Sequence, residues 1–129
     1  MILLLKSDTS ILELILLTTE GDRVHESHEC GRSMAKDIPA LIDTFLLRRS
    51  MNIHQLKGLG VFAGPGSFTG LRITHSYANS LAYALEIPIV SAGGETWEVA
   101  VTDRLANGEN DRVIVPDYGK DAHITQQKK

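Results

Sequence analysis

Gly64-Pro65-Gly66-Ser67-Phe68-Thr69-Gly70-Leu71-Arg72 is the stretch around which this chain of 129 residues is organised. An apolar run at residues 59–63 precedes it, and small and apolar residues at helical spacing follow it. The pattern therefore predicts a strand, a tight turn and a helix. Glycine on both sides of Pro65 lets the chain reverse, and Ser67 is placed to cap the N–H groups that begin the helix.

A turn of this kind has two uses. It can aim the N–H groups of the helix at a phosphate, or it can let the helix pack closely on the sheet. No lysine follows as in a P-loop, and no third glycine stands at dinucleotide-binding spacing, so the spacing alone favours packing. We expect Gly66 to adopt a backbone conformation that is poor for other residues, and Gly70 to be needed for close approach.

The longer string carries more information than the turn. Together with Leu81-Ala82-Tyr83-Ala84-Leu85-Glu86-Ile87-Pro88-Ile89-Val90 it resembles the TsaB (YeaZ) family, whose hallmark is GPGSFTGLR followed by a helix that ends in G-L-A-x-A-L-x-I-P. The resemblance extends upstream to Asp8-Thr9-Ser10 and Ile38-Pro39-Ala40-Leu41-Ile42-Asp43. These proteins are a subunit of the bacterial machinery that makes N6-threonylcarbamoyladenosine beside the tRNA anticodon.

Length and composition narrow the function classes. The length predicts one domain, and the formal net charge of −3, with both signs interspersed, does not suggest a surface that holds nucleic acid unaided. Cys30 is the only cysteine, which excludes an internal disulfide and fits a reducing cytoplasm. The apolar residues 2–5 are too few for a signal-peptide core or a membrane span, so we expect a cytoplasmic protein without membrane contact.

Hydrophobic periodicity predicts an α/β protein. The first three strands should form an antiparallel meander, the third of them polar enough for a sheet edge, and the central strand should lead into the glycine-containing turn. Residues 1–115 are expected to form one domain and residues 116–129 a polar tail. We expect strands at residues 2–5, 11–17, 23–28, 58–63, 87–91 and 113–115, and helices at residues 33–49, 68–86 and 95–105.

The segment His25-Glu26-Ser27-His28-Glu29-Cys30 contains good metal ligands, but its spacing argues against a metal site. Positions three apart on a strand point to opposite faces, so His25 and His28 should not converge. The H-E-x-x-H spacing that works on a helix is one residue longer. We therefore expect a solvated edge strand.

Two predicted helices, at residues 33–49 and 68–86, are apolar beyond what a sheet can cover, and the second has a small-residue outer side. We expect them to lie side by side on one face of the sheet and to pair with the equivalent helices of another subunit. For the small-residue outer side of the helix at residues 68–86, a second helix of the same chain lying over it is an equally good explanation of the pattern. The residues predicted to make the partner interface are Ala35, Ile42, Leu46, Ile73, Tyr77, Ser80 and Ala84.

The resemblance implies a single actin-like, RNase H-like lobe of the ASKHA superfamily, with a mixed sheet of antiparallel and parallel strands. Family members lack catalysis of their own and pair with the catalytic subunit TsaD, with TsaE as a further partner. In the catalytic relative, two metal-binding histidines follow the strand that corresponds to residues 87–91, whereas residues 92–97 here contain none. By resemblance Asp8 stands where related folds present an Asp to metal or phosphate. Since Lys6-Ser7 interrupts the expected apolar strand, we interpret Asp8 as turn-forming.

Three functions follow as hypotheses. The first is a non-catalytic partner of TsaD that reaches tRNA only through the complex and forms a homodimer alone. It would have no cofactor in the isolated chain, with ATP and metal on TsaD. The second is a nucleotide-binding or nucleotide-hydrolysing protein, and the third is a self-associating module. The family motif, which is also the candidate phosphate-binding turn, comprises Gly64, Pro65, Gly66, Ser67, Thr69, Gly70 and Arg72.

Overall fold

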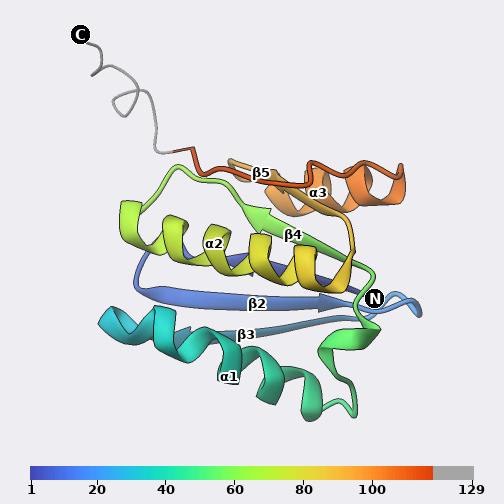
Figure 1. The fold of residues 1–129 in the computed structure, drawn as a ribbon, viewed down its shortest axis with the longest axis horizontal. Helices are drawn as coiled ribbons and strands as arrows, with labels where there is room; N and C mark the ends of the chain where they lie inside the picture. Colours follow the sequence, from blue (N-terminus) through green and yellow to red (C-terminus); the bar gives the residue numbers. More distant parts are fainter. Residues whose placement is uncertain (118–129) are drawn as a thin grey trace, which may run out of the picture.

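The computed structural model describes residues 1–117, which form a five-stranded mixed sheet with helices on both faces (Figure 1). The strand order is β3-β2-β1-β4-β5, in which β1, β2 and β3 pair antiparallel and β1, β4 and β5 pair parallel. The predicted meander is confirmed, and β3 lies at the sheet edge as expected. The strands are β1 (Ile2–Lys6), β2 (Ile11–Leu17), β3 (Arg23–Glu29), β4 (Gly58–Phe62) and β5 (Ile89–Ala92).

The three α-helices divide between the two faces. Helices α1 (Met34–Leu47) and α2 (Phe68–Leu85) lie side by side on one face and run in the same direction, whereas α3 (Trp97–Ala106) lies on the other face (Figure 1). Short 3₁₀ turns, η1 (Gly31–Ser33) and η2 (Ile53–Gln55), precede α1 and β4. The predicted side-by-side helices are therefore confirmed.

Covering both faces explains the continuous apolar run of β1. Successive side chains of a strand point to opposite faces, so Leu3 and Leu5 join the core under α1 and α2, and Leu4 joins the core under α3. All three side chains are fully buried. A strand buried on both sides needs no polar alternation, which is why the sequence of β1 predicts a central position.

The predicted strand at residues 113–115 is wrong. This stretch has no strand partner and instead runs along α2, where the Asn79 amide exchanges two hydrogen bonds with the backbone of Ile114, at 3.0 and 2.9 Å. Ile114 is buried in the core, while Val113 and Val115 are 69% and 74% exposed. An alternating exposure pattern therefore arises here from one anchored side chain and not from sheet pairing. Residues 118–129 of the predicted tail lie outside the described part of the chain.

None of the helices within residues 1–117 combines the length and the apolar character needed to cross a membrane.

Candidate functional site: the glycine turn and the helix layer

The glycine turn, residues 64–67, packs directly on the turn between β1 and β2. A Cβ on Gly66 would lie 2.5 Å from the Cβ of Asp8, and a Cβ on Gly70 would lie 2.4 Å from the carbonyl oxygen of Ser7. The Ser67 N–H donates to the carbonyl of Asp8 at 2.8 Å. Two chain segments about sixty residues apart thus meet at backbone distance, which only glycine permits. The predicted close approach at Gly70 is confirmed.

The prediction for the backbone of Gly66 is wrong. Gly64 is the residue of this turn in the left-handed region, with a φ of 117°, and Gly66 is not among the residues with positive φ. The peptide bond between Gly64 and Pro65 is cis. Gly66 is needed for a steric reason instead, because the Asp8 backbone occupies the space that a side chain would take.

A small buried polar network ties the start of α2 to the end of β1. The Ser7 hydroxyl is fully buried and hydrogen-bonds the carbonyl of Gly70 at 2.7 Å and the hydroxyl of Thr74 at 2.9 Å. Buried hydroxyls of this kind are costly unless they are satisfied, so the network fixes how the helix meets the sheet. Neither Ser7 nor Thr74 was predicted as a site residue from the sequence. The sequence feature that could have revealed this network is the polar Lys6-Ser7 pair at the end of an apolar strand.

The exposed side of the turn presents the start of α2. Ser67 caps the helix by accepting from the N–H of Gly70 at 3.3 Å. Phe68 is 55% exposed, and the guanidinium of Arg72 lies over its ring at 5.2 Å from the centroid. The carboxylate of Asp8 lies 3.9 Å from the ammonium of Lys6. Asp8 thus contributes its backbone to the turn contact, in agreement with our interpretation of it as turn-forming.

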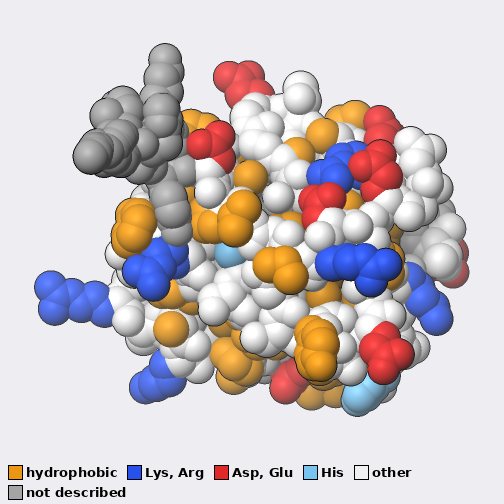
Figure 2. All heavy atoms as spheres, turned by 45° about the horizontal axis from the view of Figure 1, so that its top comes forward, with side chains coloured by type: hydrophobic (Ala, Val, Ile, Leu, Met, Phe, Trp, Pro, Cys, Tyr) orange, Lys and Arg blue, Asp and Glu red, His pale blue; other side chains and the backbone are white. Residues whose placement is uncertain are grey.

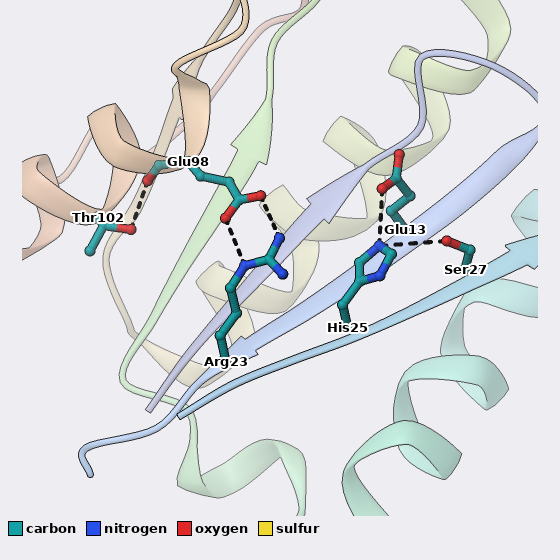
Figure 3. Close-up of polar contacts among 6 residues, drawn as sticks. All are labelled: Glu13, Arg23, His25, Ser27, Glu98 and Thr102. Atoms are coloured by element: carbon teal, nitrogen blue, oxygen red, sulfur yellow. Dashed lines mark hydrogen bonds and ion pairs between the residues drawn. The ribbon is translucent and has the colours of Figure 1, made fainter. Parts of the chain in front are cut away.

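On the face opposite α1, a polar cluster on β2 and β3 resembles a catalytic constellation only in composition (Figure 3). The Nε2 atom of His25 lies 3.0 Å from Glu13 and 3.5 Å from the hydroxyl of Ser27. A hydrolytic triad uses the two ring nitrogens separately, one toward the nucleophile and one toward the acid. Here a single nitrogen contacts both partners, so the cluster cannot relay a proton from serine to carboxylate.

His28 points the other way, toward Glu26, with an Nε2 to Oε1 distance of 3.0 Å. The prediction that His25 and His28 do not converge is confirmed. Glu26 also binds Arg48 at the end of α1, and this hydrogen bond lowers the pKa of the Glu26 carboxyl. The described residues contain no group of three or more His, Cys, Asp or Glu side chains that could hold a metal ion.

We call the outer surface of α1 and α2 the helix layer. The structure corrects the predicted interface at two positions, because Ile42 and Leu46 are fully buried between α1 and the sheet and cannot reach a partner. Both belong to the apolar face with which α1 covers its own core. The other predicted interface residues lie at the surface of the layer: Ala35, Ser80 and Ala84 are exposed, and Ile73 and Tyr77 are half-buried.

A hollow of about 430 Å³ lies between the two helices near their N-terminal ends. Its lining is Ala35, Thr69, Arg72, Ile73, Ser76 and Tyr77. Burial, assisted by the charge of Asp43, raises the pKa of the Tyr77 phenol, so this ring stays neutral at physiological pH. The structure therefore brings three of the predicted interface residues together with two members of the glycine motif, in one concave surface.

Comparison with known proteins finds similarity over the part of the chain that contains the glycine turn and the helix layer. A family model described as TsaD: tRNA N6-adenosine threonylcarbamoyltransferase matches residues 24–92, more than half of the chain. The Haemophilus influenzae tRNA threonylcarbamoyladenosine biosynthesis protein TsaB is 28% identical over 96 residues, 74% of this chain and 41% of that protein. The protein of the same name from Buchnera aphidicola subsp. Schizaphis graminum is 30% identical over 88 residues, which are 67% of this chain and 42% of the relative.

Among solved structures, a Pseudomonas aeruginosa protein described as similar to peptidase YEAZ superposes with a TM-score of 0.66 at 25% identity, covering 71% of this chain and 42% of that one. YeaZ from Pseudomonas aeruginosa superposes with a TM-score of 0.65 at 24% identity, covering 71% and 44%. The chain thus spans less than half the length of the relatives it matches. It belongs to the family that the TsaD model describes and, within it, to the TsaB (YeaZ) members with their actin-like, RNase H-like fold.

Proposed function

We propose that this chain is a non-catalytic partner subunit of a TsaD-containing complex that makes N6-threonylcarbamoyladenosine in tRNA. The observation that carries the proposal is the helix layer. It is a concave surface lined by small and half-buried apolar side chains together with Thr69, Arg72 and Ser76, on a member of a family whose relatives are named for threonylcarbamoyladenosine biosynthesis. Such a surface suits a second helical layer, because small residues let helices approach closely.

The glycine turn supports a structural role in preference to nucleotide hydrolysis. The space above Gly66 and Gly70 is filled by the chain's own Asp8 and Ser7, so the absence of side chains there is used for internal packing. Together with the His25 geometry, this favours a subunit without activity of its own. We propose that the isolated chain needs no cofactor and that ATP and metal act on the TsaD partner.

The charge distribution favours tRNA contact through the complex. Figure 2 shows lysine, arginine and acidic side chains interspersed on the described part of the face it displays, without a broad basic surface. Nucleic acid binding depends strongly on such a surface. We therefore place this chain beside TsaD in the cytoplasm, with TsaE as a further partner, and expect a homodimer through the same helix layer when TsaD is absent.

Copurification with the TsaD homologue of the same organism tests the proposal. We expect a stable complex with the parent chain and a loss of binding for Ala84→Asp, because the substitution buries an unpaired carboxylate at the contact. Val99→Asp is the matched control, since Val99 is 62% exposed on α3, on the opposite face of the sheet. It should bind like the parent.

Two results would contradict this assignment. One is failure of the parent chain to bind the TsaD homologue at micromolar concentration. The other is ATP hydrolysis, peptidase or transferase activity of the purified chain that is lost on Ser67→Ala or Asp8→Ala, which would favour the nucleotide-hydrolysing alternative or another catalytic role.

A further inference from the structure

Residues 113–117, which we call the strap, lie along α2 and run antiparallel to it (Figure 1). The side-chain amide of Asn79 exchanges hydrogen bonds with both backbone groups of Ile114. At the other end, the N–H of Asp117 donates to the carbonyl oxygen of Ala63 at 2.7 Å. No strand of the described chain pairs with the strap, so it is attached near its ends and not through a ladder of sheet hydrogen bonds.

His75 lies under the strap. Leu71, His75 and Asn79 follow one another at four-residue spacing and therefore share one side of α2. Asn79 holds the first end of the strap, whereas Leu71 lies beside Gly64, which the second end contacts at Asp117. The strap therefore passes over the residue between them, and His75 is only 2% exposed.

One nitrogen of the buried His75 ring has no hydrogen-bond partner among the described residues. The Nδ1 atom lies 2.7 Å from the carbonyl oxygen of Leu71, which is an acceptor, so we assign the proton of the neutral ring to Nδ1. Nε2 is then a bare acceptor, buried and unpaired. In the strap the N–H groups of Ile114 and Asp117 are engaged elsewhere, and Pro116 has none. The closed strap therefore carries the cost of an unsatisfied buried atom.

The strap also begins at a strained residue. Arg112 has a φ of 68°, in the left-handed region. The N–H of Val113 donates to the carbonyl oxygen of Asp111 at 2.7 Å, which makes Arg112 the central residue of a γ-turn. With a positive φ this is the rare and strained form of that turn. Opening of the strap at Arg112 relieves this second cost.

We infer that the strap opens as a separate unit, about the γ-turn and with the rest of the domain folded, and that a proton on Nε2 of His75 drives it open. In the closed state that proton has no acceptor and leaves a charge buried, whereas in the open state water solvates the ring. Burial lowers the pKa of His75 in the closed state, which agrees with this direction.

The charged groups around His75 do not reverse the response. Strands β4 and β5, against which α2 packs, contain no titratable side chain. Lys6 of β1 lies over the Phe62 ring, and Arg72 of α2 lies over the Phe68 ring. Asp117 is the one charged residue of the strap. With all these groups in place the pKa of His75 is still lowered, so burial sets the sign.

Opening of the strap affects the glycine turn directly. A Cβ on Gly64 would lie 2.3 Å from the carbonyl oxygen of Asp117, and the N–H of Asp117 is bonded to Ala63, the preceding residue. The closed strap thus packs on the turn from which α2 begins. Its release loosens that turn and, through it, the start of the helix layer.

Amide hydrogen exchange of the full chain, followed by NMR, measures opening of the strap separately from unfolding. The reporter is the Asp117 amide, since none of the variants below removes its acceptor, and the reference is the Leu4 amide in β1, which pairs on both sides. With intrinsic rates corrected for pH, we expect the opening constant at Asp117 to exceed that at Leu4 at least about 100-fold.

The pH dependence tests the role of His75. Between about pH 7.5 and pH 5.5 the opening constant at Asp117 should rise about five- to tenfold in the parent, because only the open ring takes up a proton near its ordinary pKa of about 6.5. His75→Leu and His75→Gln lack this group and should change less than about twofold. If the leucine variant is misfolded by circular dichroism, the glutamine variant carries the comparison. His54→Leu, at an exposed histidine of η2, is the matched control and should respond like the parent.

Two variants test the attachments of the strap. Arg112→Gly relieves the strain at the γ-turn, so the opening constant at about pH 7.5 should fall about three- to tenfold, after allowing for the freedom that glycine adds to the open state. Asn79→Ala removes both hydrogen bonds to Ile114 and should raise this constant at least about tenfold.

Two results would overturn the inference. If the Asp117 and Leu4 amides exchange with the same opening constant, the strap does not open separately from the domain. If the strap opens but its pH response is the same in the parent and in the His75 variants, His75 does not control it. The experiment uses no partner, so either failure leaves the proposed function standing, and binding of the TsaD homologue remains the separate test of that function.

Discussion

Substituting Gly70 by alanine sets two effects of opposite sign against each other. Gly70 is the third residue of α2, and in an ordinary helix interior the change would stabilise by about 1 kcal/mol. Here the new Cβ would lie 2.4 Å from the carbonyl oxygen of Ser7 and 3.0 Å from that of Thr9. Both oxygens belong to the backbone of the β1–β2 turn, which cannot rotate aside as a side chain would.

The magnitude follows from what must move. To reach ordinary contact, the start of α2 must shift by about 1 Å, and overpacking of this kind costs about 1–3 kcal/mol. The shift also strains the Ser7 to Gly70 hydrogen bond of 2.7 Å and the Ser67 to Asp8 bond of 2.8 Å, each worth about 1 kcal/mol. After subtracting the gain in helix propensity, we expect a net loss of about 2–3 kcal/mol and a Tm lowered by about 8–12 °C.

Urea unfolding followed by far-ultraviolet circular dichroism measures the difference. Thr44→Ala is the matched control, because Thr44 is exposed on α1, where alanine should stabilise slightly through propensity alone. If Gly70→Ala proved as stable as the parent, or more stable, the contact between the two turns would not have the steric role assigned to it, and helix propensity would dominate at this position.

Three further predictions concern the same fold. Gly66→Val should unfold the protein or abolish partner binding, because its Cβ would lie 2.5 Å from that of Asp8; a variant with parent-like stability in urea and parent-like binding contradicts this. Burial lowers the pKa of His75 below its unfolded value of about 6.5, so the unfolded chain binds the proton more readily than the folded one. The stability that neutral His75 contributes is therefore present above that pH and is lost as the pH falls. The free energy of unfolding of His75→Leu should therefore decrease less than that of the parent between pH 7 and pH 5, and an identical decrease refutes the assignment. The hydrogen bond from Arg48 lowers the pKa of Glu26, so the stability difference between the parent and Glu26→Gln at pH 7 should shrink as the pH falls below the ordinary glutamate value; a difference independent of pH would exclude this pair as its source.

Much of the fold could be predicted because its signals are local. The continuous apolar residues of β1 and the polar character of β3 predicted their central and edge positions, and the Ser67 cap predicted where α2 begins. The failures involve contacts between distant segments. Val113 and Val115 have strand-like composition, but the Asn79 side chain holds the backbone between them and no strand pairs with it.

The candidate site divides in the same way. The string from Gly64 to Arg72 identified the family and the turn, since a turn needs particular residues at fixed offsets. The sequence could not show that Gly64 has the positive φ and that Gly66 only makes room for Asp8. That difference depends on where the β1–β2 turn lies, and the two segments meet only in the folded chain.

By itself the sequence determined the types of the helices and of the five sheet strands, the mixed sheet and the family, because hydrophobic period and turn chemistry act within a few residues of the chain. Only the tertiary structure decided which apolar residues of the helices are available to a partner. Ile42 and Ala35 both belong to the apolar side of α1, yet the sheet covers the first and leaves the second at the rim of an open hollow. The two positions are seven residues apart and lie on nearly the same side of the helix, so their exposure depends on what each meets along the axis of α1, which is set by the packing of the whole core.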